Sequence, residues 1–267
     1  MSQAAGVYRS GVAGATPVLL LHSSQSNSSQ WRLLLAQLQH FDVLAIDLLG
    51  YGNAPAVPTE VAEHFRFSAE LPRILSAIEH AQWQQPVHLV GHSYGAALAL
   101  KIAVEQPVAV ASLAVFEPVA FHLLDGDDPG RQQVDEIATQ MAELDPLNAT
   151  ARFVDYWNHD GFFASLPVRV QQLMVSQTAK VMLDFDALMG EPRQASDYAQ
   201  LQLPVLLLQG QYTQFSAQRV AARLLRVLPQ VRSETFACGH MGPLTHAELV
   251  NPAVLEFLQQ QRAAAPA

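Results

Sequence analysis

The sequence predicts an α/β protein built on a mostly parallel β-sheet. Two observations lead to this prediction: short apolar runs recur along the chain, and longer segments of helical periodicity lie between them. The runs are unbroken rather than alternating, as in strands that helices cover on both faces. Because the 267 residues are 50% hydrophobic and only 15% charged, the chain can bury a sizeable core.

Six segments are predicted to be strands, and helices are expected between them. The strand segments are residues 18–21, 43–46, 87–90, 113–116, 205–208 and 231–236. Apolar side chains spaced three and four residues apart predict helices around residues 31–38, 71–78, 96–104 and 216–228. Pro229 ends the last of these helices, because proline cannot continue one.

The alternation of strands and helices stops between residues 119 and 202. No strand is predicted there, but apolar residues repeat with helical spacing, as in Val134, Ile137 and Met141, and aromatic and methionine residues are frequent. We expect residues 119–202 to form a helical cap over a pocket, inserted into a core domain of residues 1–118 and 203–267. A plain pair of crossover helices is the alternative.

Composition excludes several classes of protein. The net charge of −9 and the scattered basic residues argue against binding to nucleic acid, which depends on neutralising phosphates. A single cysteine, Cys238, excludes a disulfide framework and a cysteine-built metal site. Neither a targeting peptide nor an apolar run of membrane-spanning length is visible, so a cytoplasmic protein is expected. Oligomeric state is not predicted.

The segment Gly91-His92-Ser93-Tyr94-Gly95 is a G-x-S-x-G motif between a predicted strand and a predicted helix. Small residues two positions before and after a serine allow the sharp strand-to-helix turn that exposes a nucleophile. A serine hydroxyl is a weak nucleophile near neutral pH and needs a base, for which histidine has a suitable pKa. An inert serine in a glycine-rich turn is the alternative.

Among the ten histidines, His240 is the expected base. It lies in a Gly-containing loop directly after the last predicted strand, whereas most of the others fall in turns, on helix surfaces or beside strands. His246 is the nearest competitor. Cys238 is expected to be a small buried residue and not a second nucleophile.

Four segments together resemble the α/β-hydrolase fold family. They are residues 19–24 (LLLHSS), 47–52 (DLLGYG), 91–95 (GHSYG) and 239–240 (GH), in the order of that family. The resemblance implies an eight-stranded, mostly parallel sheet, with Ser93 as nucleophile and His240 as base. It also implies an oxyanion hole formed by the backbone N–H groups of Tyr94 and Ser24, and a structural role for Asp47. Ser23 stands where the family usually has glycine, which leaves open whether the loop changes shape or the Ser23 hydroxyl adds a donor.

The acid of the expected triad is displaced from its usual place. Many family members have an aspartate after the penultimate strand, but this chain has no carboxylate between residues 198 and 233. Glu117 directly follows the predicted strand 113–116, at the same sheet edge as Ser93, so we expect it to accept the second ring N–H of His240. A carboxylate in an ordinary turn is the alternative. Rival carboxylates lie in the polar loop that follows: Asp125, Asp127 and Asp128.

These features predict a carboxylesterase-like serine hydrolase that cleaves an ester, thioester, lactone or amide of a small apolar substrate through an acyl-enzyme on Ser93. Two other classes stay open. One is a lyase, cofactor-free haloperoxidase or carbon–carbon bond hydrolase on the same scaffold, and the other is a catalytically silent binding protein. The expected chemistry requires no cofactor or metal, and the sequence has no zinc-type histidine pair or nucleotide-binding glycine motif.

Overall fold

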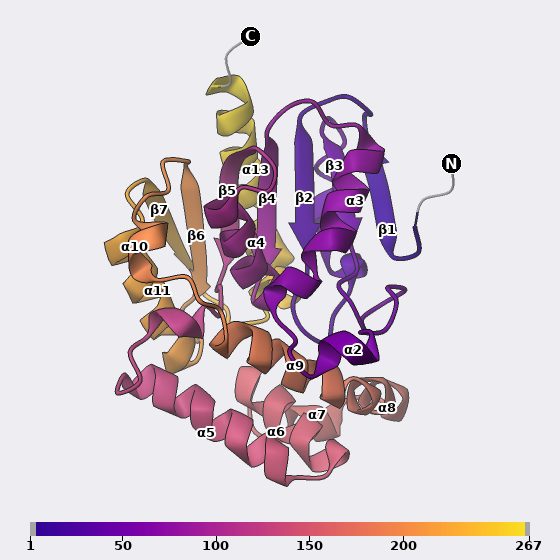
Figure 1. Ribbon diagram of the computed structural model, residues 1–267, viewed down its shortest axis with the longest axis vertical. Coiled ribbons are helices and arrows are strands. Elements are labelled where there is room, and N and C mark those ends of the chain that lie inside the picture. The colour runs from indigo at the N-terminus through magenta and orange to yellow at the C-terminus, as the bar shows by residue number, and fades with distance from the viewer. Residues whose placement is uncertain (1–3, 265–267) are drawn as a thin grey trace.

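A computed structural model describes residues 4–264 and contains a seven-stranded sheet in the order β1-β3-β2-β4-β5-β6-β7 (Figure 1). β1 runs antiparallel to β3, and the other neighbouring strands are parallel. The α/β architecture is therefore confirmed. The expected number of eight strands is wrong for the described residues, because β1 is the edge of the sheet and no further strand pairs with its outer side.

The strands are β1 (Val7–Gly11), β2 (Pro17–Leu21), β3 (Asp42–Ile46), β4 (Val87–His92), β5 (Val110–Phe116), β6 (Val205–Gly210) and β7 (Val231–Phe236). The helices outside the segment between β5 and β6 are η1 (Ser28–Trp31), α1 (Arg32–Leu35), α2 (Thr59–Ala62), η2 (Phe67–Ala69), α3 (Leu71–Ala81), α4 (Tyr94–Glu105), α11 (Phe215–Val227), α12 (Gly242–Thr245) and α13 (Ala247–Ala264). Between β5 and β6 lie η3 (Phe121–Leu123), α5 (Pro129–Glu143), α6 (Pro146–Trp157), α7 (Phe162–Ser165), α8 (Val168–Ser176), α9 (Thr178–Met189) and α10 (Ala195–Tyr198).

Helices cover both faces of the sheet. Successive strand residues point to opposite faces, so Val18 and Leu20 pack with α1 and α13, whereas Leu19 and Leu21 pack with α3, α4 and α11. All five residues of β2 and of β3 are buried, which explains why β2 and residues 43–46 of β3 are unbroken apolar runs. Because helices cover both faces of the sheet, a ligand-binding site is expected at the carboxyl ends of its strands.

The edge strand β1 was not predicted. Its sequence, VYRSG, has no apolar run, and only Val7 is buried. It is held by backbone pairing to β3 and by Arg9, whose guanidinium donates to the Asp42 carboxylate at 2.7 and 2.5 Å. These are contacts with distant parts of the chain, which a local hydrophobic pattern does not report.

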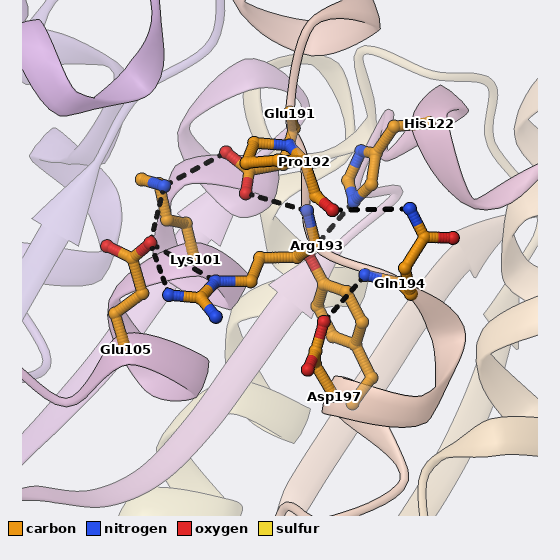
Figure 2. A network of polar contacts seen from close by, with 9 residues as sticks. Lys101, Glu105, His122, Glu191, Pro192, Arg193, Gln194 and Asp197 are labelled. Carbon is orange, nitrogen blue, oxygen red and sulfur yellow. Dashed lines mark hydrogen bonds and ion pairs between the residues drawn. The ribbon is translucent and has the colours of Figure 1, made fainter.

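The segment between β5 and β6 is helical, as predicted, and α5 to α9 lie together beyond one end of the sheet (Figure 1). We call this helical region the cap and retain residues 119–202 as its proposed extent. A buried ion pair joins its last part to the core: Lys101 of α4 contacts Glu191 at 3.0 Å and Glu105 at 2.8 Å (Figure 2). Within residues 4–264, no helix combines the length and apolar character that a membrane crossing requires.

Candidate active site

Ser93 lies in the turn from β4 to α4 with a strained backbone. Its φ of 54° and ψ of −119° are rare for a residue with a side chain. Close packing on both sides explains the flanking glycines. A Cβ atom on Gly91 would lie 2.6 Å from the Cα atom of Ala96, and one on Gly95 would lie 2.4 Å from the carbonyl oxygen of His22. Only glycine fits at these two positions, and the turn projects the Ser93 side chain beyond the end of β4.

His240 reaches Ser93 from the loop between β7 and α12. The Ser93 hydroxyl lies 2.9 Å from Nε2 of His240, so it can donate to this nitrogen. The ring is stacked against Trp157 of α6, with ring centroids 3.9 Å apart and planes at 30°. Below it, Nε2 of His92 donates to the His240 carbonyl oxygen at 2.9 Å. The imidazole is therefore fixed by the cap on one side and by the β4 turn on the other.

Glu117 holds the other nitrogen of the same ring. It follows β5 with a φ of 44°, and its carboxylate is almost completely buried, 1% exposed. Oε2 accepts from Nδ1 of His240 at 2.5 Å and from the Thr213 hydroxyl at 2.6 Å, while Oε1 accepts from the Gly210 N–H at 2.6 Å. Because charge-assisted hydrogen bonds of this length are strong, the carboxylate orients Nδ1–H toward itself and leaves Nε2 facing Ser93.

The rival histidines have other contacts. His246 is bonded to the neighbouring Thr245 hydroxyl. The ring of His22 donates to the Ser23 carbonyl oxygen and accepts from the Leu48 N–H, and burial lowers its pKa from 6.5 to about 4. Its role is to fix the backbone of the loop after β2.

One rival acid, Asp128, and two other residues noted in the sequence, Asp47 and Cys238, do not take part in the triad. Asp128 caps α5 and pairs with Arg219 at 2.6 Å. Asp47 accepts from backbone N–H groups of Ser28 and Asn53, a structural arrangement. Burial raises the pKa of the Cys238 thiol to about 11, which leaves it protonated at neutral pH.

The two expected oxyanion donors lie beside the serine. Tyr94 is the first residue of α4, and an N–H group at this position has no partner within its helix. Ser24 shares both cavities next to Ser93. The question left open at Ser23 has a structural answer: its hydroxyl and its N–H both donate to Oε1 of Gln30, at 3.0 and 3.2 Å, so they are already occupied.

Two small cavities, of about 20 and 50 Å³, open onto Ser93 beneath the cap. Cavities of this size hold one to a few water molecules. The smaller one is lined by Ser24, Ser93, Val119, Phe121, Phe153, Trp157, Val181, Asp184, Phe185 and Leu188. The larger one is lined by Ser23, Ser24, Gln25, Ser93, Phe153, Val154, Trp157, Asn158, Met174, His240 and Met241. A separate cavity of about 1020 Å³ between β1 and α3 contains none of the three residues Ser93, His240 and Glu117.

Sequence reasoning missed two contacts of this site. Trp157 was noted as one of many cap aromatics, but its stacking on His240 joins residues 83 positions apart and has no local signal. Asp184 was not noted, although a charged residue in the otherwise apolar segment VMLDF of α9 is a signal that a buried partner exists.

Comparison with known proteins shows the family of this chain. The family model described as "Alpha/beta hydrolase family" matches residues 18–253. The chain belongs to the alpha/beta hydrolase family. Lipase LipV of Mycobacterium tuberculosis is 33% identical over 146 residues, a match that spans 54% of this chain and 52% of the lipase.

Two other proteins match over nearly the whole chain. A 2-hydroxy-6-oxononadienedioate/2-hydroxy-6-oxononatrienedioate hydrolase of Paraburkholderia phymatum is 25% identical, covering 93% of this chain and 88% of that enzyme. The crystal structure of an enol-lactonase from Burkholderia xenovorans superposes with a TM-score of 0.77 at 15% identity, covering 96% of each chain. At this identity the superposition shows the common fold.

Proposed function

We propose that this protein is a serine hydrolase that forms an acyl-enzyme on Ser93. The observation that supports the proposal most strongly is the continuous set of hydrogen bonds from Ser93 through His240 to Glu117, at 2.9 and 2.5 Å, at one end of the sheet. This is the arrangement of nucleophile, base and orienting acid that acyl transfer needs. The family membership and the named hydrolases among its relatives support the same class of reaction.

The proposed reaction has two halves. The Ser93 oxygen attacks the substrate carbonyl carbon while Nε2 of His240 takes the hydroxyl proton, and Glu117 stabilises the imidazolium that forms. The backbone N–H groups of Tyr94 and Ser24 stabilise the oxyanion. The proton passes from His240 to the leaving group as the acyl bond breaks. Water then attacks the acyl carbon and gives a proton to His240, which passes this proton to the Ser93 oxygen as the bond to the acyl group breaks and the acid product leaves.

The cavities favour a small, uncharged substrate with a short acyl group. The smaller cavity is lined mainly by apolar side chains, and its one charged residue, Asp184, is an acid and offers no cation to a substrate carboxylate. Among the residues lining either cavity there is no lysine or arginine. An ester, thioester, lactone or amide of a small apolar acid fits these conditions. The small-molecule substrate and the cytoplasmic location are part of this proposal.

A carbon–carbon bond hydrolase is the second candidate, because hydrolases named for 2-hydroxy-6-oxononadienedioate and 2-hydroxy-6-oxononatrienedioate match most of the chain. Their named substrates are dicarboxylates, and a dicarboxylate is normally bound by cationic side chains. The lining of the two cavities described above offers none, so we place ester hydrolysis first.

The experiment is fluorophosphonate labelling of wild type and of Ser93→Ala, followed by a panel of short esters, lactones, thioesters and a diketone. We expect rapid labelling of wild type, none of the variant, and turnover of short esters that is lost in Ser93→Ala. Preferential turnover of the diketone would favour the second candidate. Absence of both labelling and turnover in wild type would favour a binding protein.

A further inference from the structure

The chain has only two lysines, and both are buried in ion pairs between the cap and the core. Lys101 of α4 is 5% exposed and Lys180 of α9 is 6% exposed. Lysine is ordinarily a solvated residue, and its burial is costly unless carboxylates surround the ammonium group. The ammonium group of Lys101 pairs with the buried carboxylate of Glu191 (Figure 2). The ammonium group of Lys180 pairs with buried carboxylates next to the candidate active site.

The ammonium of Lys180 lies between two buried carboxylates. It contacts Glu70 at 3.3 Å, and it pairs with Asp184 one turn further along α9. Asp184 uses its second oxygen, Oδ2, to accept from the hydroxyls of Tyr51 and Ser24, both at 2.6 Å. Since both oxygens of Asp184 are occupied, this residue is not a free base for a substrate. Its carboxylate instead joins a cap helix to the loop that carries Ser24.

Both expected oxyanion donors touch this cluster. Ser24 contacts it through the hydroxyl described above, and Tyr94 donates from its hydroxyl to Oε1 of Glu70 at 3.4 Å. The Lys180 ammonium also lies 4.8 Å from the ring centroid of Tyr94. Ser24 lies in the loop after β2, and Tyr94 is the first residue of α4, 70 positions later. Asp184 of α9 holds the Ser24 hydroxyl, whereas Glu70 of the core holds the Tyr94 hydroxyl.

The core fixes the Tyr94 N–H more firmly than it fixes the Ser24 N–H. The Tyr94 N–H is fixed by the turn at Ser93 and by α4. Ser24 is partly exposed, and the residue after it, Gln25, has a φ of 53°, so the loop changes direction there. Gln25 is also tied to the cap, since its side-chain amide donates to the Met174 carbonyl oxygen at 3.0 Å. The loop at residues 24–25 therefore has cap residues as its side-chain partners.

We propose that Asp184 is a positioning residue for the oxyanion hole. It holds the Ser24 hydroxyl and thereby aims the Ser24 N–H at the cavity beside Ser93, so that the hole is complete only when α9 is seated on the core. Lys180 holds Asp184 in place. This inference rests on the proposed hydrolase function. It predicts that loss of the Asp184 contact lowers the rate of the chemical step more than it weakens substrate binding.

The test compares Asp184→Asn with Asp186→Asn, the same substitution two residues later on the exposed side of the same helix. For Asp184→Asn we expect kcat for a short ester to fall about 10²-fold with KM changed less than about threefold, because a misplaced donor costs transition-state stabilisation. The inhibition constant of a trifluoromethyl ketone, whose adduct places an oxyanion in the hole, is expected to rise with the fall in kcat. Asp186→Asn is expected to match wild type.

Ser24→Ala is the second variant, and it leaves Asp184 with its contacts to Tyr51 and Lys180. We expect it to lower kcat by about the same 10²-fold with an unchanged melting temperature, because it removes the same hydrogen bond to Asp184. In the double variant, Asp184→Asn is expected to lower kcat less than about threefold further, because its route through Ser24 is already removed. Full kcat in Ser24→Ala, or effects of the two substitutions that simply multiply, would overturn the proposal.

The outcomes separate the two levels of inference. A wild-type protein that is labelled at Ser93 and hydrolyses esters, with Asp184→Asn changing only the melting temperature, overturns the positioning role and leaves the proposed function intact. A wild-type protein that neither labels nor turns over any ester removes the proposed function, and the positioning role with it.

Discussion

Replacing Glu117 by glutamine tests the geometry of the site most sharply, because the change is isosteric. A glutamine side chain has one oxygen and one NH₂ group where the carboxylate has two acceptors. If its oxygen faces His240, the NH₂ group meets the Gly210 N–H, and two donors oppose each other. If the oxygen faces Gly210, the NH₂ group donates to Nδ1 of His240. The ring then carries its proton on Nε2, facing Ser93, and cannot accept the hydroxyl proton.

The expected loss in kcat/KM is about 10³ to 10⁴-fold, the usual consequence of removing the acid of such a triad. This loss corresponds to about 4 to 5 kcal/mol of transition-state stabilisation. The assay is hydrolysis of the best short ester from the panel, with fluorophosphonate labelling as a second readout. Glu143→Gln, an exposed glutamate at the end of α5, is the matched control and is expected to behave as wild type. If Glu117→Gln keeps kcat/KM within about threefold of wild type, the assignment of the acid is wrong.

Three further predictions concern the surroundings of the site and the core. Trp157→Ala should lower kcat about 10²-fold, because the imidazole of His240 loses the ring that orients it. Trp157→Phe keeps an aromatic face and should keep most of the activity. Ester kinetics below the melting temperature measure both variants, and equal rates for the two would contradict this prediction. Burial lowers the pKa of His88 from 6.5 to about 4, so the unfolded chain binds this proton at a higher pH than the folded protein does. Acidification from pH 7 to pH 5 should therefore cost wild type about 2 kcal/mol of stability that His88→Gln does not lose. Urea unfolding of both proteins at both pH values measures this, and an equal loss of stability in the two proteins would refute it. Lys101→Met removes the ion-pair partner of the buried Glu191 carboxylate and should lower the free energy of unfolding by about 3 to 5 kcal/mol in the same assay. A loss below about 1 kcal/mol would contradict this prediction.

Much of the fold could be predicted because its core strands are buried on both faces. β2 and β3 consist of buried residues, so β2 and residues 43–46 of β3 are unbroken apolar runs. β1 could not be predicted in this way, since most of its side chains are exposed and its stability comes from pairing with β3. The expected eighth strand came from the family resemblance and not from any run of residues in this chain.

The predicted site residues came from local signals, whereas no local signal identifies the partners in the missed contacts. Ser93 is marked by the glycines that its turn requires, and Glu117 by its place directly after a strand. The contact of Asp184 with Ser24 joins residues 160 positions apart, and no spacing rule predicts it. The available clue was Asp184 itself, because a charged residue in an apolar segment of a helix such as α9 needs buried partners, although the sequence does not say which.

The central claim is that Ser93 carries the acyl group during turnover. The most direct measurement is rapid mixing with p-nitrophenyl acetate, followed by acid quench and peptide mass spectrometry. We expect a burst of p-nitrophenol close to one equivalent per protein and an acetyl group on the peptide that contains Ser93, with neither in Ser93→Ala. Turnover with no burst and no acetylated Ser93, or a burst that persists in Ser93→Ala, would contradict it.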